Sequence, residues 1–194
     1  MTEVSPIMAL LKDLSRQTDE FAQATGLRCK EGCGKCCENP DVETTVVEVM
    51  PLALHLWETG GAQEIWDGIE SRKDPDDSKR YRQACVFYTP DPVVAGNGRC
   101  SIYEFRPGIC RLFGFATKRG KAGQKQLVTC RMMKENFSVD CGKAQEHIDA
   151  GQPVASLSDH GFKVRSLDPH WGKELLPINE AVKIAVERVS FTRR

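Results

Sequence analysis

Cysteine is the residue type in this sequence that is most able to do chemistry. The chain contains nine cysteines in 194 residues, and four of them fall within one short stretch that also holds Gly32 and Gly34. These four are Cys29, Cys33, Cys36 and Cys37. Glycine lets the backbone turn tightly, so several sulfur atoms of one loop can face a common point. Thiolates are the soft ligands that zinc and iron–sulfur clusters select, so the stretch predicts a metal-binding loop.

The later cysteines extend this prediction. Two short extended runs over 84–88 and 99–103 are separated by turn-forming residues, which indicates a β-hairpin that brings Cys85 and Cys100 together. Pro107 suits the first turn of a helix over 106–113, which would carry Cys110 back toward the hairpin. The predicted metal ligands are Cys29, Cys33, Cys36, Cys37, Cys85, Cys100, Cys110 and Cys130. We interpret Cys141 as the spare thiol, although it is interchangeable with Cys130 in this scheme.

A disulfide framework is disfavoured, because an odd number of cysteines leaves one unpaired and because no secretory signal is recognisable at residues 1–11. We therefore expect a cytoplasmic protein with reduced thiols. Basic residues adjoin five of the nine cysteines, as Arg28 adjoins Cys29 and Arg111 adjoins Cys110. Such cations would lower the free-energy cost of deprotonating the thiols.

The composition excludes several other classes of protein. Lysine and arginine together number 27, as do aspartate and glutamate, so the formal net charge is +0 and a nucleic-acid partner is not expected. No apolar run is long enough for a transmembrane helix, and we expect no membrane partner. Neither a nucleotide-binding glycine motif nor a Ser-His-Asp signature occurs. No catalytic residue is predicted, so it stays open whether the protein is an enzyme.

The elements that must position these cysteines are mostly helices. We expect a mainly α fold with a small β-hairpin (α+β), formed by a single domain over 1–194. Its metal-binding core would span about 29–141, with the N- and C-terminal helices packed on it. Thr45 and Glu48 have the spacing of a capping box and predict a helix from Thr45 toward Trp57, within which Pro51 should produce a kink or delay the start. Further helices are expected over 5–26, around 65–69, from Cys141 to about 150 and over 178–189; a loop is expected over 118–125 and a strand over 126–129.

The quoted motifs resemble a known family. The run from Cys29 to Cys37, followed by Cys100-Ser-Ile-Tyr-Glu-Phe-Arg-Pro-Gly-Ile-Cys110-Arg, is similar to the YkgJ-type cysteine-cluster (CxxCxxCC) family of zinc- or iron-chelating domains. In that family two residues separate the first two cysteines, whereas three separate Cys29 from Cys33 here. The resemblance implies chelation of zinc or iron by these cysteines. It does not imply a reaction.

Three functional hypotheses follow. The first is a metal-binding protein that chelates a zinc or iron ion through thiolates. The alternative is an iron–sulfur enzyme or redox protein with a [4Fe-4S] cluster, including S-adenosylmethionine-dependent methyl transfer. The spacing of Cys29, Cys33 and Cys36 matches that of radical enzymes, and flagellin lysine methylases resemble this family in their cysteine region, but the alternating strands and helices of radical-enzyme barrels are absent from the pattern. The third hypothesis is delivery of a metal ion to an unidentified protein partner.

Overall fold

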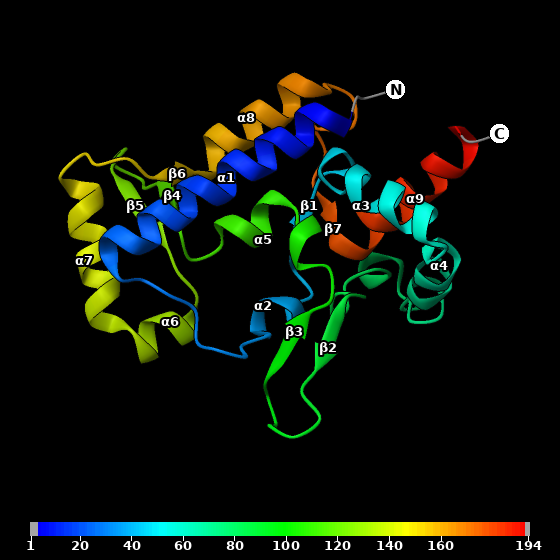
Figure 1. Cartoon of the computed structure of the whole chain (residues 1–194), viewed down its shortest axis with the longest axis horizontal. Helices are drawn as coiled ribbons and strands as arrows, with labels where there is room; N and C mark the ends of the chain where they lie inside the picture. The colour runs from blue at the N-terminus through cyan, green and yellow to red at the C-terminus, as the bar shows by residue number, and fades with distance from the viewer. Residues whose placement is uncertain (1–3, 193–194) are drawn as a thin grey trace. The chain divides into compact units, whose positions relative to one another are not determined.

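The computed structural model describes residues 4–192 of the chain, which divides into two compact units (Figure 1). Unit 1 comprises the chain up to Met8, Gly32–Pro107 and the chain from Val164 onward. Unit 2 comprises Ala9–Glu31 and Gly108–Lys163. Two helices, α1 (Val4–Thr25) and α8 (Leu157–Leu167), contribute residues to both units.

Two helices form the core of unit 1. These are α3 (Val46–Thr59) and α9 (Ile178–Thr192), which pack along each other. Their buried faces are aliphatic, with Val49 and Leu52 on α3 and Val182 and Val186 on α9 each exposed by 2% or less. The indole Nε1 of Trp57 also donates to the backbone oxygen of Val186 at 2.9 Å. Apolar burial therefore determines how α9, which is last in the sequence, pairs with α3.

The start of α3 confirms the predicted capping box. Thr45 Oγ1 accepts a hydrogen bond from the Glu48 backbone, while the Glu48 side chain accepts one from the Thr45 backbone. These reciprocal bonds satisfy donors that the first turn of a helix leaves without partners. Pro51 lies inside α3 and does not delay its start, and Gly60 ends the helix with a φ of 80°.

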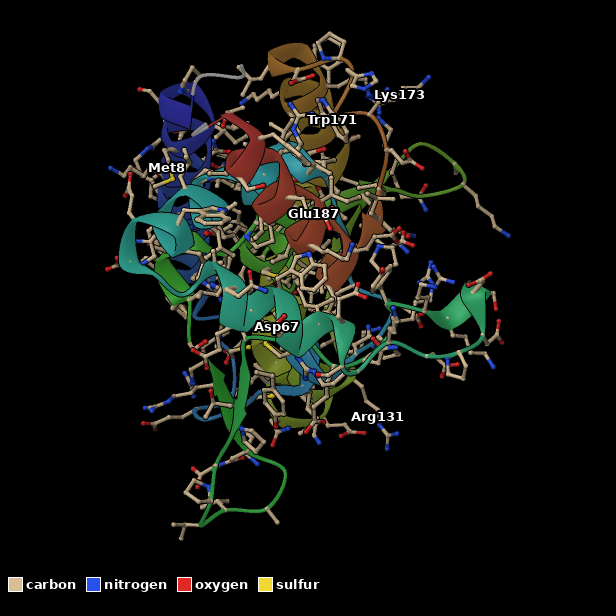
Figure 2. The ribbon with its side chains drawn as sticks, turned by 90° about the vertical axis from the view of Figure 1, so that its right-hand side faces the viewer. Met8, Asp67, Arg131, Trp171, Lys173 and Glu187 are labelled. Atoms are coloured by element: carbon tan, nitrogen blue, oxygen red, sulfur yellow. The ribbon has the colours of Figure 1, made fainter. Side chains whose placement is uncertain are left out.

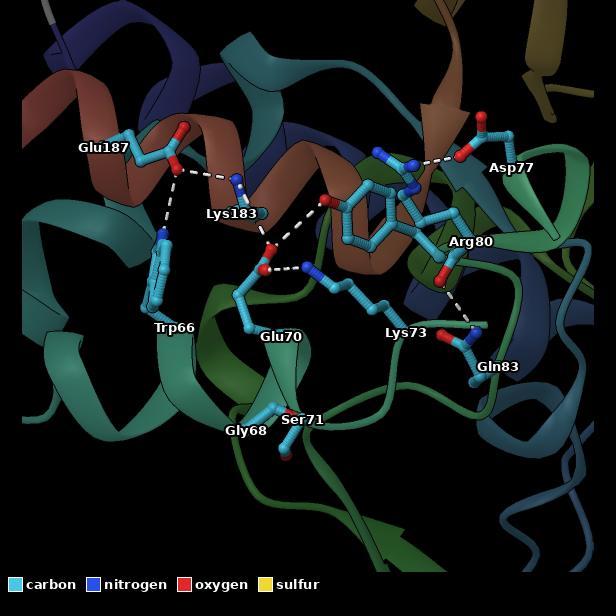
Figure 3. A network of polar contacts seen from close by, with 11 residues as sticks. Trp66, Gly68, Glu70, Ser71, Lys73, Asp77, Arg80, Gln83, Lys183 and Glu187 are labelled. Atoms are coloured by element: carbon cyan, nitrogen blue, oxygen red, sulfur yellow. Dashed lines mark hydrogen bonds and ion pairs between the residues drawn. The ribbon is translucent and has the colours of Figure 1, made fainter. Parts of the chain in front are cut away.

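A third helix, α4 (Ala62–Glu70), packs on α9 in unit 1. Figure 2 shows Asp67 on α4 beside the α9 ribbon that carries Glu187. Polar contacts reinforce this packing: Trp66 Nε1 donates to Glu187 at 2.9 Å, and Lys183 lies 2.7 Å from Glu187 and 3.6 Å from Glu70 (Figure 3). The long segment after α4 is irregular except for one turn of 3-10 helix, η1 (Asp77–Lys79), and leads to Cys85.

The strands of unit 1 are short. Strand β1 (Glu43–Thr44) pairs with β7 (Leu176–Pro177), and β2 (Tyr88–Pro90) pairs with β3 (Gly98–Cys100), both antiparallel. The predicted hairpin therefore exists and Cys85 lies near Cys100, but Cys85 is not on a strand, because β2 begins only at Tyr88, which pairs with Cys100. Cys85 precedes the hairpin in a turn in which the Tyr88 backbone N–H donates to the Cys85 oxygen at 3.0 Å. A one-turn helix, α2 (Lys35–Glu38), lies next to β3. A 3-10 turn, η2 (Tyr103–Phe105), follows β3 in the chain.

Unit 2 contains a three-stranded sheet and short helices. Strand β4 (Ala116–Arg119) lies between β5 (Lys125–Val128), which is antiparallel to it, and β6 (Ala155–Ser156), which is parallel. Its helices are α5 (Gly108–Leu112), α6 (Arg131–Asn136) and α7 (Ser138–Asp149). Phe21, Leu27, Met133, Ala144 and Ile148 form one buried apolar cluster in this unit.

The predicted mainly α fold is confirmed, since helices make up 55% of the structure and the sheets are small. The single-domain organisation stays a prediction. The predicted loop over 118–125 is shorter than expected, because residues 118–119 and residue 125 pair as β4 and β5. None of the helices in the described part of the chain has the length and apolar character needed to span a bilayer.

Candidate metal centre

Four thiols of unit 1 come together from three separate stretches of the chain. Cys36 and Cys37 lie on α2, Cys85 lies in the turn before β2, and Cys100 ends β3. The Cys37 thiol lies close enough to the Cys36 thiol and to the Cys100 thiol to shift the pKa values of both. Cys85 is close enough to Cys36 and Cys100 to interact with both electrostatically. Cys37 is therefore the central member of the group.

Backbone hydrogen bonds bring these stretches together. The Cys85 N–H donates to the Cys37 oxygen at 2.8 Å, so the turn before β2 is attached to α2. The Gly98 N–H donates to the Gly32 oxygen, also at 2.8 Å, which attaches β3 to the chain before α2. Gly32 has a φ of 68°, a conformation that residues with a Cβ rarely adopt. Gly32 therefore lets the backbone turn tightly before Cys33, as the sequence predicted.

The segment before Cys85 is attached to the rest of unit 1 by its side chains. Tyr81 donates to Glu70 on α4 at 3.2 Å, and Arg82 contacts Glu43 on β1 at 2.7 Å. Figure 3 shows Glu70 between Lys73 and Lys183, both of which it contacts. Although the segment is irregular, its course is determined by these contacts.

The thiols differ in acidity because of their mutual contacts. Contact with the Cys37 thiol lowers the pKa of Cys36 and that of Cys100 below the ordinary value for cysteine. The hydrogen bonds with Cys100 and Cys36 raise the pKa of Cys37, since this thiol retains its proton beside two acidic neighbours. Burial raises the pKa of Cys85, which is only 7% exposed, to about 12. Because Cys37 has a single S–H, it can donate to one neighbour at a time and favours the ionised form of Cys36 or of Cys100.

Two arginines supply positive charge to the group. The Arg106 guanidinium helps to lower the pKa values of Cys36 and Cys100, and Arg72 favours the ionised form of Cys85. Arg106 lies over the Tyr103 ring, 3.5 Å from the ring centroid. In the sequence, Arg106 could be singled out because it belongs to the Arg-Pro pair of the cysteine motif. Nothing in the sequence pointed to Arg72, which lies in the irregular segment after α4.

The other predicted ligands are divided between the two units. Cys33 belongs to unit 1, where it forms an isolated β-bridge with Asn97. Cys29, Cys110 and Cys130 belong to unit 2, as does Cys141. Cys130 and Cys141 both pack against the Phe21 cluster and interact electrostatically, and burial raises the pKa of Cys141. Cys130 also caps α6, because its sulfur accepts from the Met133 N–H at 3.4 Å.

No disulfide joins any of the nine cysteines, all of which lie among the described residues. Within residues 4–192, no group of three or more histidine, cysteine, aspartate or glutamate side chains has metal-binding geometry as it stands. The four thiols nevertheless suit zinc or iron in their chemistry, since all are sulfur donors and two of them ionise readily. Metal binding would require ionisation of both Cys37 and Cys85, whose pKa values are raised, and a closer approach of the sulfur atoms.

A comparison of the sequence with protein-family models gives a match. Residues 28–131 match the model described as "CxxCxxCC: Putative zinc- or iron-chelating domain". The chain belongs to this family. The CxxCxxCC match includes all eight predicted ligands, whereas Cys141 and α9 lie outside it. No curated protein and no solved structure matches the chain.

Proposed function

We propose that this CxxCxxCC protein chelates one zinc or iron ion through Cys36, Cys37, Cys85 and Cys100. The observation that carries the proposal is the convergence of α2, the turn at Cys85 and the end of β3, which places Cys37 beside both Cys36 and Cys100. Thiols rarely gather in this way for packing alone, since a cysteine buried for packing needs only apolar neighbours. A divalent ion would replace the proton on Cys37 as the centre of the group.

The surroundings support an anionic site. Four thiolates around a divalent ion carry a net negative charge, and bringing them together without cations would be costly. Arg106 and Arg72 reduce this cost, since both favour ionised thiols in the group. A site with four sulfur ligands and no open position is typical of structural metal centres, so we expect the ion to stabilise unit 1.

Cys29, Cys33, Cys110 and Cys130 stay predicted metal ligands that are assigned to no particular ion. The spare thiol, Cys141, stays a prediction as well. We expect the protein to be cytoplasmic, because thiols that are not joined in disulfides persist in a reducing compartment. The metal ion is the partner that the family supports, and delivery of that ion to a second protein stays a hypothesis.

The all-sulfur donor set favours one alternative. Four cysteine thiolates also hold [4Fe-4S] clusters, so a redox or methyl-transfer protein with such a cluster is the second candidate. Zinc protein is colourless and contains no inorganic sulfide. A brown protein with equal amounts of iron and acid-labile sulfide would establish the cluster in place of the single ion.

Metal analysis of the full chain purified without oxygen tests the proposal. We expect stoichiometric zinc or iron in the wild type and in the Cys141→Ser variant, which removes a thiol outside the family match. Cys37→Ser should lower the metal content, because it removes the central sulfur. A wild-type protein without stoichiometric metal, or a Cys37→Ser variant with the full wild-type content, would refute the proposed site.

A further inference from the structure

A buried asparagine outside the family match holds the backbone on both sides of Cys85. Asn179 lies in the first turn of α9 and is only 3% exposed. Its side-chain oxygen accepts a hydrogen bond from the Val86 N–H at 2.9 Å. Its amide nitrogen lies 3.2 Å from the Ala84 oxygen, 3.3 Å from that of Gln83 and 3.4 Å from that of Tyr81.

The hydrogen bonds of Asn179 satisfy backbone N–H and C=O groups that have no partner in a helix or a strand. Residues 82–85 belong to no helix or strand, so their polar groups depend on other parts of the chain once they are buried. A carboxamide offers both an acceptor for an N–H group and donors for carbonyl oxygens. A carboxylate lacks the donors, and an aliphatic side chain lacks both. Asparagine is therefore chemically matched to this segment.

Hydrogen bonds connect Asn179 to the other cysteines through the backbone around Cys85. Asn179 bonds to Ala84 and Val86, the two immediate neighbours of Cys85. The Cys85 N–H in turn donates to the Cys37 oxygen at 2.8 Å. The backbone of Cys85 is thus held between α9 on one side and α2 on the other. Rotation or displacement of this residue would require that buried hydrogen bonds break.

We propose that Asn179 is a positioning residue of the metal centre, which acts by holding the Cys85 sulfur toward Cys36, Cys37 and Cys100. This inference rests on the proposed function and extends the site to α9, which lies outside the matched residues 28–131. Partners that orient metal ligands typically contribute about 10- to 100-fold to metal affinity. Asn179 belongs to this class, since it touches the ligand segment and no predicted ligand directly.

Two substitutions test the proposal in the full chain. Asn179→Asp keeps the shape and the acceptor but removes the donors, whereas Asn179→Ala removes both without adding a charge. Zn²⁺ affinity, measured by competition with a chromophoric chelator, should fall about 10- to 100-fold in each folded variant. The absorption of the Co²⁺-loaded variants should show the weaker thiolate-to-metal band of a site that has lost one sulfur, as in Cys85→Ser.

A double-mutant cycle separates positioning from general stability. If Asn179 acts through Cys85, adding Asn179→Ala to Cys85→Ser should cost little further affinity. Fully additive losses would overturn the proposal. Trp57→Phe is the matched control, because it removes a hydrogen bond to α9 at Val186 without touching the Cys85 segment. This control should keep the wild-type Co²⁺ spectrum, and a loss as large as that of Asn179→Ala would also count against positioning.

A readout on the metal-free protein distinguishes failure of this inference from failure of the proposed function. Cys85 is buried, so the wild type should be alkylated slowly at this position under native conditions, as followed by mass spectrometry. Both Asn179 variants should be alkylated faster at Cys85, whereas Trp57→Phe should not. Unchanged alkylation would overturn the inference even if the metal site is real. If the Asn179 variants are alkylated faster but the wild type binds no metal, Asn179 does position Cys85 and the proposed metal centre is refuted.

Discussion

The Tyr88 hydroxyl donates a hydrogen bond of 2.8 Å to Glu38, which places the Tyr88 ring across the strand that ends at Cys100. The ring occupies the space that side chains at Gly34 and Gly98 would need. Gly34 directly precedes α2 and Gly98 begins β3, so a single aromatic ring lies against the two elements that carry Cys36, Cys37 and Cys100. The absence of a Cβ at these positions is what lets α2 and β3 approach each other.

The first prediction concerns this contact. Gly98→Ala should push the Tyr88 ring away from β3 and lower the free energy of unfolding by about 1–3 kcal/mol, the usual cost of overpacking. Metal affinity should fall as well, because Cys100 is two residues away. Gly142→Ala on α7 is the control, since a Cβ there meets no atom within 4 Å. Urea unfolding measures both variants, and equal stabilities would contradict the prediction.

The second prediction concerns metal removal. A bound ion stabilises the folded state by mass action, by about 2.7 kcal/mol when its free concentration is 100 times Kd. A strong chelator should therefore lower the Tm of the wild type. It should have a much smaller effect on Cys37→Ser, which has already lost the central sulfur of the proposed site. Differential scanning calorimetry measures both, and a Tm that does not respond to the chelator in the wild type would show that the ion is not structural.

The third prediction concerns the partly buried ion pairs between α4 and α9. Lys183 is only 17% exposed, contacts Glu187 and Glu70, and lies 5.4 Å from the centroid of the Trp66 ring (Figure 3). Lys183→Met should lower the free energy of unfolding by about 1–3 kcal/mol, because it leaves two partly buried carboxylates with fewer partners. Denaturant unfolding measures this loss.

An exposed network provides the comparison for Lys183. Arg16 on α1 contacts Asp13 and Glu20, but its side chain is 59% exposed. Arg16→Met should therefore cost no more than about 1 kcal/mol, as exposed ion pairs are screened by water. A cost as large as that of Lys183→Met would show that burial does not decide the strength of these pairs.

The fourth prediction concerns pH. Burial, assisted by the charge of Glu174, raises the pKa of Glu180 on α9 above its ordinary value of 4.5. A raised pKa means that the folded state favours the protonated form. Glu180 therefore opposes folding progressively as the pH rises from 4.5 through its folded pKa, and the penalty is complete only above that folded pKa.

Glu180→Gln should remove this penalty. The variant should be more stable than the wild type at neutral pH, and the difference should vanish below pH 4.5, where the wild-type carboxyl is protonated in both states. Chemical denaturation across this pH range is the measurement. Glu64→Gln, on an exposed position of α4, is the control. A wild type that is more stable than Glu180→Gln at neutral pH would reverse the sign and refute the argument.

Features encoded by neighbouring residues were predictable. The capping box of Thr45 and Glu48 predicted the start of α3, and the apolar spacing after Ile178 predicted α9. The hairpin was predicted, but the bounds of its strands differ from the predicted runs. Strand β2 begins at Tyr88, four residues after the start of the predicted run over 84–88, because the backbone N–H groups of Cys85 and Val86 bond to Cys37 and Asn179 and not to the opposite strand. Helix α8 has a weakly apolar sequence and was not predicted.

By itself, the sequence determined the chemistry: the types and spacing of the cysteines pointed to thiolate ligands for zinc or iron, and the family match agrees with that conclusion. Only the tertiary structure decided which thiols meet, since Cys36, Cys37, Cys85 and Cys100 gather in unit 1 while four other cysteines belong to unit 2. The physical reason is the range of the interactions. Short motifs act over a few residues, whereas the position of Cys85 depends on Asn179, more than 90 residues later, which reaches it only because α9 packs on α3.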